Sequence, residues 1–353
     1  MSADLRIARH DHIGLITLTR PQALNALNLA MIQTMQRQLL QWQIDDSIHA
    51  VVIMAEGDRA FCAGGDVRWL YEAGRAHDPQ QMQFFWHEYR LNHFIHRFGK
   101  PYISLMNGIT MGGGVGISLH GSHPVASERF HFAMPETGIG FFPDIGASYL
   151  LAGCPDYFGM YLGLTCHRLN ASEALACRLV KQIVSSEQFP ALLSDLIEAD
   201  LSRNAFERVD GCILKYALTL DDAAIFDHKE IINSCFNHDN VEAIISSLNQ
   251  MDHQWAADTA RQLLQKSPLS LKVTFEQIRK AQSLSMGECV KMDYRLVGHF
   301  MQDSDFYEGV RALLVDKDKS PKWQPDSLEK VTAAKVADYF ECGQQELSLI
   351  TDG

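Results

Sequence analysis

The chain has 353 residues, of which 46% are hydrophobic and 21% are charged, so it can bury a sizeable core and is neither disordered nor collagen-like. Its 31 Lys and Arg residues against 43 Asp and Glu residues give a net charge of −12, which argues against a protein built to bind nucleic-acid phosphates. The net charge alone does not exclude a local basic groove. The eight cysteines include no C-x-x-C pair, so they predict neither a disulfide scaffold nor a zinc ribbon and favour a reducing compartment.

The first residues, MSADLRIARHDHIG, contain no apolar signal core and run directly into strand-like sequence. We therefore expect no secretion signal or organelle presequence and predict a cytoplasmic protein. Residues 101–127 carry no charged side chain and reach the length of a membrane span, about 20 residues, but their glycines and histidines make the run too polar and flexible for hydrocarbon. An uncharged, glycine-rich run of this kind predicts the buried centre of a site.

Hydrophobic patterning predicts two strands within the first 20 residues, a helix from about Asn28 and a strand near 49–57. Asn28 can cap this helix, whose apolar residues recur at steps of three and four. The recurring residues are Ile32, Met35, Leu39 and Trp42. The next expected elements are a helix over 79–98, strands at 101–106, 123–127 and 130–134, and a short helix that ends at Gly153.

From about residue 190 the pattern becomes mostly helical. Helical spacing occurs in segments 191–202, 240–251, 254–266 and 268–281. Ser267-Pro268 reads as a cap followed by proline at the first helical position, and another helix is expected from Met286. We therefore predict an α/β core over residues 1–205 and a mostly helical region over residues 206–353 that packs on the core.

Two glycine turns share one pattern, because each follows a predicted strand and precedes a predicted helix. They are FCAGGDV at 61–67 and MGGGVG at 111–116. Glycine lets a ligand approach the backbone, and the first amides of a helix have no internal partner. If the amides of Gly65 and Gly113 point at one spot, they form a two-donor hole for a thioester or enolate oxygen. The alternative is that these glycines only permit tight turns and close packing.

The glycine turns do not have the residue spacing of the known nucleotide-binding motifs. Gly112-x-Gly114 is followed at the third required position by Ile117, so the dinucleotide-binding fingerprint is incomplete. The pair Gly108 and Gly113 lacks the Lys-Ser/Thr that a P-loop requires. The sequence also has no G-x-S-x-G nucleophile elbow, so a serine hydrolase is not supported.

Two carboxyl groups stand eight residues apart in AMPETGIGFFPDIGAS, at Glu136 and Asp144. The glycines between them let the loop fold back, which would bring both acids into one partly apolar pocket and raise one pKa towards the range useful for proton transfer. Alternatively, Asp144 is an N-cap for a helix that starts at Ile145, and Glu136 is a solvated loop charge.

Glu88 lies in a helix crowded with aromatic residues, so it faces either an aromatic pocket or the solvent, and helical spacing alone favours the solvent. His93/His96 and His120/His123 stand three apart, but no cysteine or carboxylate pattern accompanies them, so we predict packing or surface histidines and no metal site.

Taken together, several segments resemble the crotonase (enoyl-CoA hydratase/isomerase) superfamily. These are RPQALNALN at 20–28, AFCAGGDVR at 60–68 and NGITMGGGVGIS at 107–118. Within the superfamily, nearly the whole chain is similar to the 3-hydroxyisobutyryl-CoA hydrolase family. The segments that carry this closer resemblance are FFWHEYRLN at 84–92, FAMPETGIGFFPDIG at 132–146, SPLSLKVT at 267–274 and EGVRALLVDKDKSPKW at 308–323.

The resemblance implies an α/β fold built as a spiral of ββα units, with Gly65 and Gly113 as the oxyanion-hole donors. It implies that Glu136 is the principal catalytic carboxylate and Asp144 its partner, and that Glu88, Gly113, Glu136 and Asp144 contact substrate. The regions that hold CoA in the superfamily match Ala23, Asn25, Ala26, Leu27, Ala63, Asp66 and Arg68. The implied activity is hydrolysis of a short 3-hydroxyacyl-CoA in valine catabolism, without metal or redox cofactor.

One departure separates the hypotheses within the superfamily. Hydratases resemble this chain at MGGGVG but carry a second catalytic glutamate where Gly116 stands here. Thioester hydrolysis needs one carboxylate and a group for the leaving thiolate's proton, so Gly116 favours a hydrolase over a hydratase or isomerase. A catalytically silent CoA-binding protein is a third hypothesis. Related enzymes often form trimers or hexamers through C-terminal helices that differ here, so whether this chain forms a homo-oligomer stays open.

Overall fold

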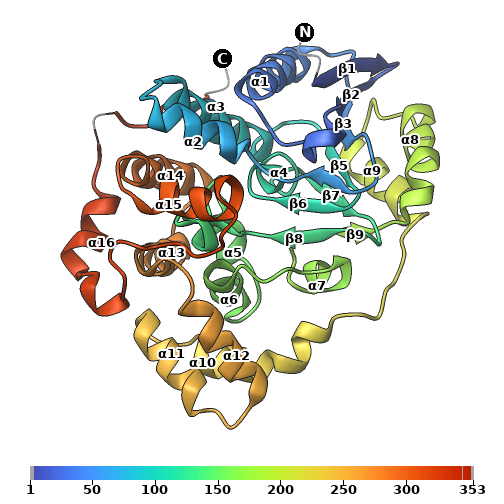
Figure 1. The fold of residues 1–353 in the computed structure, drawn as a ribbon. Helices are drawn as coiled ribbons and strands as arrows, with labels where there is room; N and C mark the ends of the chain where they lie inside the picture. Colours follow the sequence, from blue (N-terminus) through green and yellow to red (C-terminus); the bar gives the residue numbers. More distant parts are fainter. Residues whose placement is uncertain (1–3, 344, 351–353) are drawn as a thin grey trace.

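A computed structural model describes residues 4–343 and 345–350, and its centre consists of two sheets (Figure 1). The larger sheet has six strands in the order β1-β2-β3-β5-β7-β9; β1 and β2 are antiparallel, and the other pairs are parallel. Its strands are β1 (Leu5–His10), β2 (Ile13–Leu18), β3 (Ala50–Ala55), β5 (Tyr102–Met106), β7 (His123–Ala126) and β9 (Gln182–Ile183). The strands predicted from alternation are confirmed.

The smaller sheet has three parallel strands in the order β4-β6-β8. They are β4 (Ala60–Cys62), β6 (Ile109–Met111) and β8 (His131–Ala133). Each follows a strand of the larger sheet along the chain, so β3–β4, β5–β6 and β7–β8 alternate between the two sheets before a helical segment follows. This is the predicted spiral of ββα units.

The helices between the strands are α1 (Leu29–Ile44), α2 (Val67–Arg75), α3 (Gln80–His96), α4 (Gly113–Gly116), α5 (Ala147–Ala152), α6 (Phe158–Thr165) and α7 (Ala171–Ala176). Side chains cap three of them, α1, α2 and α7. Asn28 accepts a 2.9 Å hydrogen bond from the amide of Met31, which confirms it as the cap of α1. The apolar face predicted for α1 is buried.

Helices dominate the second half of the chain, as predicted. They are α8 (Phe189–Glu198), α9 (Ala205–Leu214), α10 (Lys229–Cys235), α11 (Val241–Gln250), α12 (Gln254–Leu263), α13 (Pro268–Ala281), α14 (Met286–Phe300), α15 (Asp305–Val310) and α16 (Ala333–Phe340). Ser267 caps α13 by accepting a 3.1 Å hydrogen bond from the Ser270 amide. Helices α13, α14 and α15 lie beside α2, α3 and α5, whereas α8 and α9 lie across the sheets from them (Figure 1).

The main hydrophobic core contains side chains from both halves of the chain, from Leu5 to Leu347, and a smaller core lies between the larger sheet and α8 and α9. The domain boundary near residue 205 stays a prediction.

Residues 101–127 are almost entirely buried at the centre of the molecule, which confirms the predicted burial of this uncharged run. No helix within residues 4–343 and 345–350 is both long and apolar enough to cross a membrane.

Candidate active site

The two glycine turns adjoin each other at the ends of neighbouring strands of the smaller sheet. Strands β4 and β6 pair in parallel, so the chain leaves both at the same edge. A Cβ built on Gly113 would lie 3.3 Å from the Gly65 amide nitrogen. The turns were expected directly after the strands of the larger sheet; instead β4 and β6 intervene and place both turns at one point.

The amides of Gly65 and Gly113 are free to bind a ligand. Within the described part of the chain, no backbone hydrogen bond from either N–H group to a protein acceptor is found. Gly113 is the first residue of α4, where an amide has no partner inside the helix. Two adjacent unpaired amides are the arrangement that stabilises the oxygen of a polarised carbonyl.

Three carboxyl groups, those of Glu88, Glu136 and Asp144, face a cavity of about 70 Å³ beside these amides. The rest of its lining is Ala63, Gly64, Gly65, Val67, Leu70, Phe84, Phe85, Gly112, Gly113, Pro135, Ile139, Phe141 and Phe306. Glu88 is 2% exposed, and Glu136 and Asp144 are each 6% exposed. The solvent-facing alternatives for Glu88 and Glu136 are therefore wrong, because Glu88 points from α3 towards the glycine turns and α15 packs on the loop of Glu136.

Two of these carboxyl groups lie close to glycines, where a side chain would crowd them. Oxygen Oε1 of Glu88 occupies space that a Cβ on Gly113 would need, and Oε1 of Glu136 lies 3.1 Å from the corresponding Cβ position at Gly112. Glu136 starts a short 3-10 helix, Glu136–Ile139, directly after β8. The glycine turn thus brings carboxyl oxygens close to the backbone that carries the free amides.

Burial raises the pKa of all three carboxyl groups. For Glu88 and Glu136 the pKa rises well above the ordinary value because burial penalises the charged form, and the charge of Asp144 adds to the effect. Burial raises the pKa of Asp144 to about 7, although a 2.8 Å hydrogen bond from the Tyr89 hydroxyl opposes the shift. Oε1 of Glu88 and Oε2 of Glu136 have no hydrogen-bond partner among the described residues, so both are available to a substrate.

Asp144 does not cap α5, so that part of the sequence interpretation is wrong. The helix begins at Ala147 and its N-cap is Gly146, whose backbone has a φ of +72°. The Gly146 amide donates a 2.7 Å hydrogen bond to Asp293, which comes from α14. Sequence reasoning missed Asp293 because 147 positions separate it from Gly146 and no local pattern marks it.

The two segments expected to hold CoA lie against each other. The Ala63 amide donates to the carbonyl of Leu24 at 3.0 Å, and Leu27 exchanges backbone hydrogen bonds of 2.8 and 2.9 Å with Gly64 and Asp66. The loop of Ala23 and Ala26 therefore adjoins the turn that carries Gly65. Of the residues expected to hold CoA, Ala63 lines the cavity.

The polar side chains of these segments differ in availability. Asn25 is 1% exposed, and its amide group donates to the backbone carbonyls of Glu56 and Ala60, so it holds the loop in place. Asp66 caps α2. Arg68 is exposed and pairs with Glu72 at 3.3 Å, so it can turn towards a phosphate. Contact of these side chains with CoA stays a prediction.

Of the four paired histidines, His93, His120 and His123 are buried, whereas His96 is exposed. Nε2 of buried His120 lies 2.8 Å from the carbonyl of Ile145, and buried His123 pairs with Asp210 at 3.2 Å. In residues 4–343 and 345–350 no group of three His, Cys, Asp or Glu side chains is placed to hold a metal ion. The expectation of a metal-free reaction stays a prediction.

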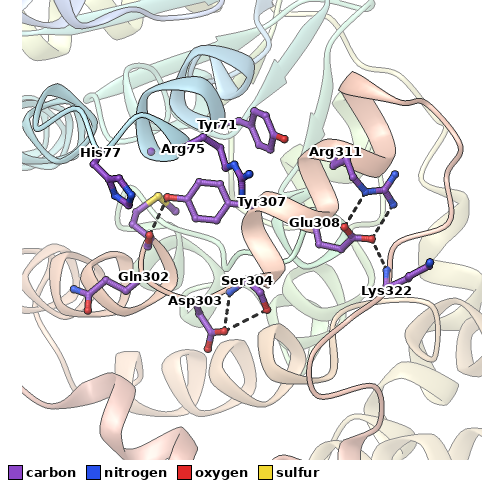
Figure 2. Close-up of a pocket in the computed structure, with 12 residues that line it drawn as sticks. Tyr71, Arg75, His77, Gln302, Asp303, Ser304, Tyr307, Glu308, Arg311 and Lys322 are labelled. Carbon is purple, nitrogen blue, oxygen red and sulfur yellow. Dashed lines mark hydrogen bonds and ion pairs between the residues drawn. The ribbon is translucent and has the colours of Figure 1, made fainter.

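A larger cavity of about 890 Å³ lies between α2 and the segment of α14 and α15 (Figure 2). Figure 2 shows the Tyr307 ring extending across it, and the Tyr307 hydroxyl donates a 2.8 Å hydrogen bond to the carbonyl of Met301. Arg311, which also lines this cavity, is paired with Glu308 at 2.8 Å. None of the three carboxyl groups of the small cavity lines this space.

The spiral fold with free glycine amides facing buried carboxyl groups defines a protein of the crotonase class. The family model for enoyl-CoA hydratase/isomerase matches residues 13–340, and the chain belongs to this family. It is 44% identical over 340 residues to the mitochondrial 3-hydroxyisobutyryl-CoA hydrolase of Xenopus tropicalis, covering 95% of this chain and 88% of that protein. The human protein of the same name is 40% identical over 331 residues, covering 93% and 86%.

Solved structures agree on the fold. A carnitinyl-CoA dehydratase from Mycobacterium thermoresistibile superposes with a TM-score of 0.93 at 34% identity, covering 99% of this chain and 100% of that one. An enoyl-CoA hydratase from Rhodobacter sphaeroides 2.4.1 has a TM-score of 0.90 at 34% identity, covering 98% and 100%.

Proposed function

We propose that the chain hydrolyses the thioester of a short 3-hydroxyacyl-CoA, with 3-hydroxyisobutyryl-CoA as its main substrate, to release 3-hydroxyisobutyrate and CoA in valine catabolism. The observation that carries this proposal is the cavity in which Glu136 and Asp144 face the free amides of Gly65 and Gly113. The names of the relatives that share about 40% identity over most of the chain support the choice of substrate.

In the proposed mechanism the amides of Gly65 and Gly113 donate hydrogen bonds to the thioester oxygen, and losing one such donor costs about 3 kcal/mol of transition-state stabilisation. The Glu136 carboxylate removes a proton from water, whose oxygen forms a bond to the carbonyl carbon, or it attacks that carbon directly and water then cleaves the anhydride. The carbon–sulfur bond breaks, and Asp144 supplies a proton to the thiolate. The reaction as proposed uses no metal or redox cofactor.

Hydration of an enoyl-CoA is the second candidate, because the two structural relatives are named as a dehydratase and a hydratase. The position at which hydratases carry their second glutamate is Gly116, and a Cβ there would lie 2.6 Å from Nδ2 of Asn92. Asn92 is fully buried, so it leaves little room for a longer side chain. This packing favours hydrolysis.

The test measures free-thiol release from 3-hydroxyisobutyryl-CoA, isobutyryl-CoA and crotonyl-CoA, together with hydration of crotonyl-CoA. We expect rapid thiol release from the 3-hydroxy substrate. Hydration without thiol release would establish the second candidate, and acyl-CoA binding without either reaction would establish a silent CoA-binding protein.

We also propose a cytoplasmic location. The vertebrate relatives are named as mitochondrial proteins, so subcellular fractionation of cells that express the full chain decides between the two compartments.

A further inference from the structure

The loop that carries Asp144 contains two consecutive residues with positive φ. Ile145 has a φ of +60° and Gly146 a φ of +72°. A β-branched residue such as isoleucine rarely adopts this left-handed conformation, because its Cβ crowds the neighbouring carbonyl. Such a conformation persists where the surrounding structure holds it, so contacts from outside the loop help to fix it.

Two fully buried side chains from the C-terminal helices supply such contacts. Nε2 of Gln277 on α13 donates a 2.9 Å hydrogen bond to the carbonyl of Pro143, and the Gly146 amide donates a 2.7 Å hydrogen bond to Oδ2 of Asp293 on α14. Gln277 also donates to Oδ1 of Asp293 at 2.8 Å, which joins the two side chains. Both residues are 0% exposed. Asp144 stands between the two backbone groups that this pair holds.

We propose that Asp293, together with Gln277, positions Asp144 for the proposed hydrolysis. Neither side chain lines the cavity of the three carboxyl groups, so both act through the loop and not on substrate. The inference rests on the proposed function for the role of Asp144. Its structural part, a buried pair that fixes residues 143–146, rests on the hydrogen bonds alone.

The substitution Asp293→Asn tests the pair with little change in size. Asp293 accepts hydrogen bonds from two N–H donors, those of Gly146 and Gln277. An asparagine has one acceptor oxygen, and its NH₂ group would face one of the two donors. Asp293→Asn therefore breaks one bond of the network.

We expect Asp293→Asn to lower kcat for 3-hydroxyisobutyryl-CoA by roughly 10- to 100-fold while KM stays within about 3-fold, because a small misplacement of a reacting group lowers the rate far more than binding. Gln277→Met, which removes both hydrogen bonds of Nε2, changes kcat in the same direction. The matched control is Glu173→Gln. Glu173 is a buried carboxylate that accepts 2.9 Å hydrogen bonds from the amides of Asn170 and Ile225, outside the site.

A readout independent of activity keeps this inference separate from the proposed function. Hydrogen exchange measured by mass spectrometry should become faster in peptides that contain residues 143–148 in Asp293→Asn and in Gln277→Met, but not in Glu173→Gln. Unchanged exchange in both variants would overturn the fixing of the loop. Faster exchange with unchanged kcat would overturn the positioning role. If the unmodified protein releases no thiol, the proposed function fails while the exchange result still tests the loop.

A double-mutant cycle identifies Asp144 as the group through which Asp293 acts. In the Asp144→Asn background, Asp293→Asn should cause less than about a 3-fold further loss of kcat, because the group it positions is already gone. The same relative loss in both backgrounds would contradict positioning of Asp144. If Asp293→Asn does not fold, Gln277→Met takes its place in the cycle.

Discussion

The Tyr89 hydroxyl donates a hydrogen bond of 2.8 Å to Oδ2 of Asp144, which lines the same cavity as Glu88 and Glu136. This bond favours the charged carboxylate, whereas burial favours the neutral acid. Burial has the larger effect, and the pKa of Asp144 rises to about 7. A carboxyl group with this pKa exchanges protons near neutral pH, which suits a donor to a leaving thiolate.

The pH dependence of the reaction should follow from these shifts. Glu136 must be ionised to activate water, and burial raises its pKa. We therefore expect kcat/KM to fall on the acid side by about tenfold per pH unit once the pH drops below that raised pKa. Tyr89→Phe removes a hydrogen bond that favours ionised Asp144, so the pKa of Asp144 should rise. Any part of the pH–rate profile that depends on Asp144 should then move to higher pH. A thiol-release assay between pH 5 and 9 checks both; a flat profile would contradict a carboxylate base.

The buried carboxyl of Asp144 should cost stability above neutral pH. Its pKa is about 7 in the folded protein against 3.8 for an unperturbed group, so between these values the folded state holds a proton that the unfolded chain has lost. The free energy of unfolding therefore falls as the pH rises through this window. We expect Asp144→Asn to raise the Tm at pH 8 by roughly 2–4 °C and to leave it unchanged near pH 4. Calorimetry at both values checks this, and a lower Tm at pH 8 would contradict it.

Gly113→Ala should inactivate the site, because the added methyl group occupies space that the substrate needs. The new Cβ would clash with Oε1 of Glu88 and would lie 3.3 Å from the Gly65 amide nitrogen. It therefore fills the space in which the thioester oxygen is expected to lie, and kcat should fall at least about 100-fold. Gly138→Ala is the control, since its Cβ would meet the end of the flexible Lys266 side chain at 3.3 Å. Equal activity of both variants would argue against the oxyanion role.

Arg68→Ala tests the predicted contact with CoA. Arg68 is exposed and makes a surface ion pair with Glu72, so losing that pair changes stability by less than about 1 kcal/mol. We expect KM for acyl-CoA to rise by about 3- to 10-fold at low salt, and less at high salt, with kcat unchanged. A KM that does not respond to Arg68→Ala at any salt concentration would remove Arg68 from the CoA site.

Much of the fold could be predicted from the sequence because it depends on neighbouring residues. The cap of α1 at Asn28 and the start of α13 at Ser267-Pro268 use chemistry within one turn of the chain. The glycine turns were also visible, since a strand, a pair of glycines and a helix follow one another. What local patterns did not show was that two short strands, β4 and β6, carry both turns to one edge.

The burial of the site could not be predicted in the same way. Glu136 reads locally as a loop charge, but Gly140, four residues further on, packs directly on the backbone of Asp305 at the start of α15. Asp144 reads locally as a helix cap, but Asp293 binds the amide of Gly146 instead. Both outcomes depend on helices that lie more than a hundred residues away in the sequence. The glycine-rich loop indicated that Glu136 and Asp144 could share a pocket, and the resemblance to a known family added their expected roles.

The most direct test of the account compares the unmodified chain with Glu136→Gln. The measurement is single-turnover thiol release from 3-hydroxyisobutyryl-CoA, with binding of CoA measured by calorimetry on the same preparations. The account predicts that Glu136→Gln loses at least about 1,000-fold in rate while CoA binds with unchanged affinity, as general-base catalysis requires. Thiol release by Glu136→Gln at the rate of the unmodified protein would contradict the account.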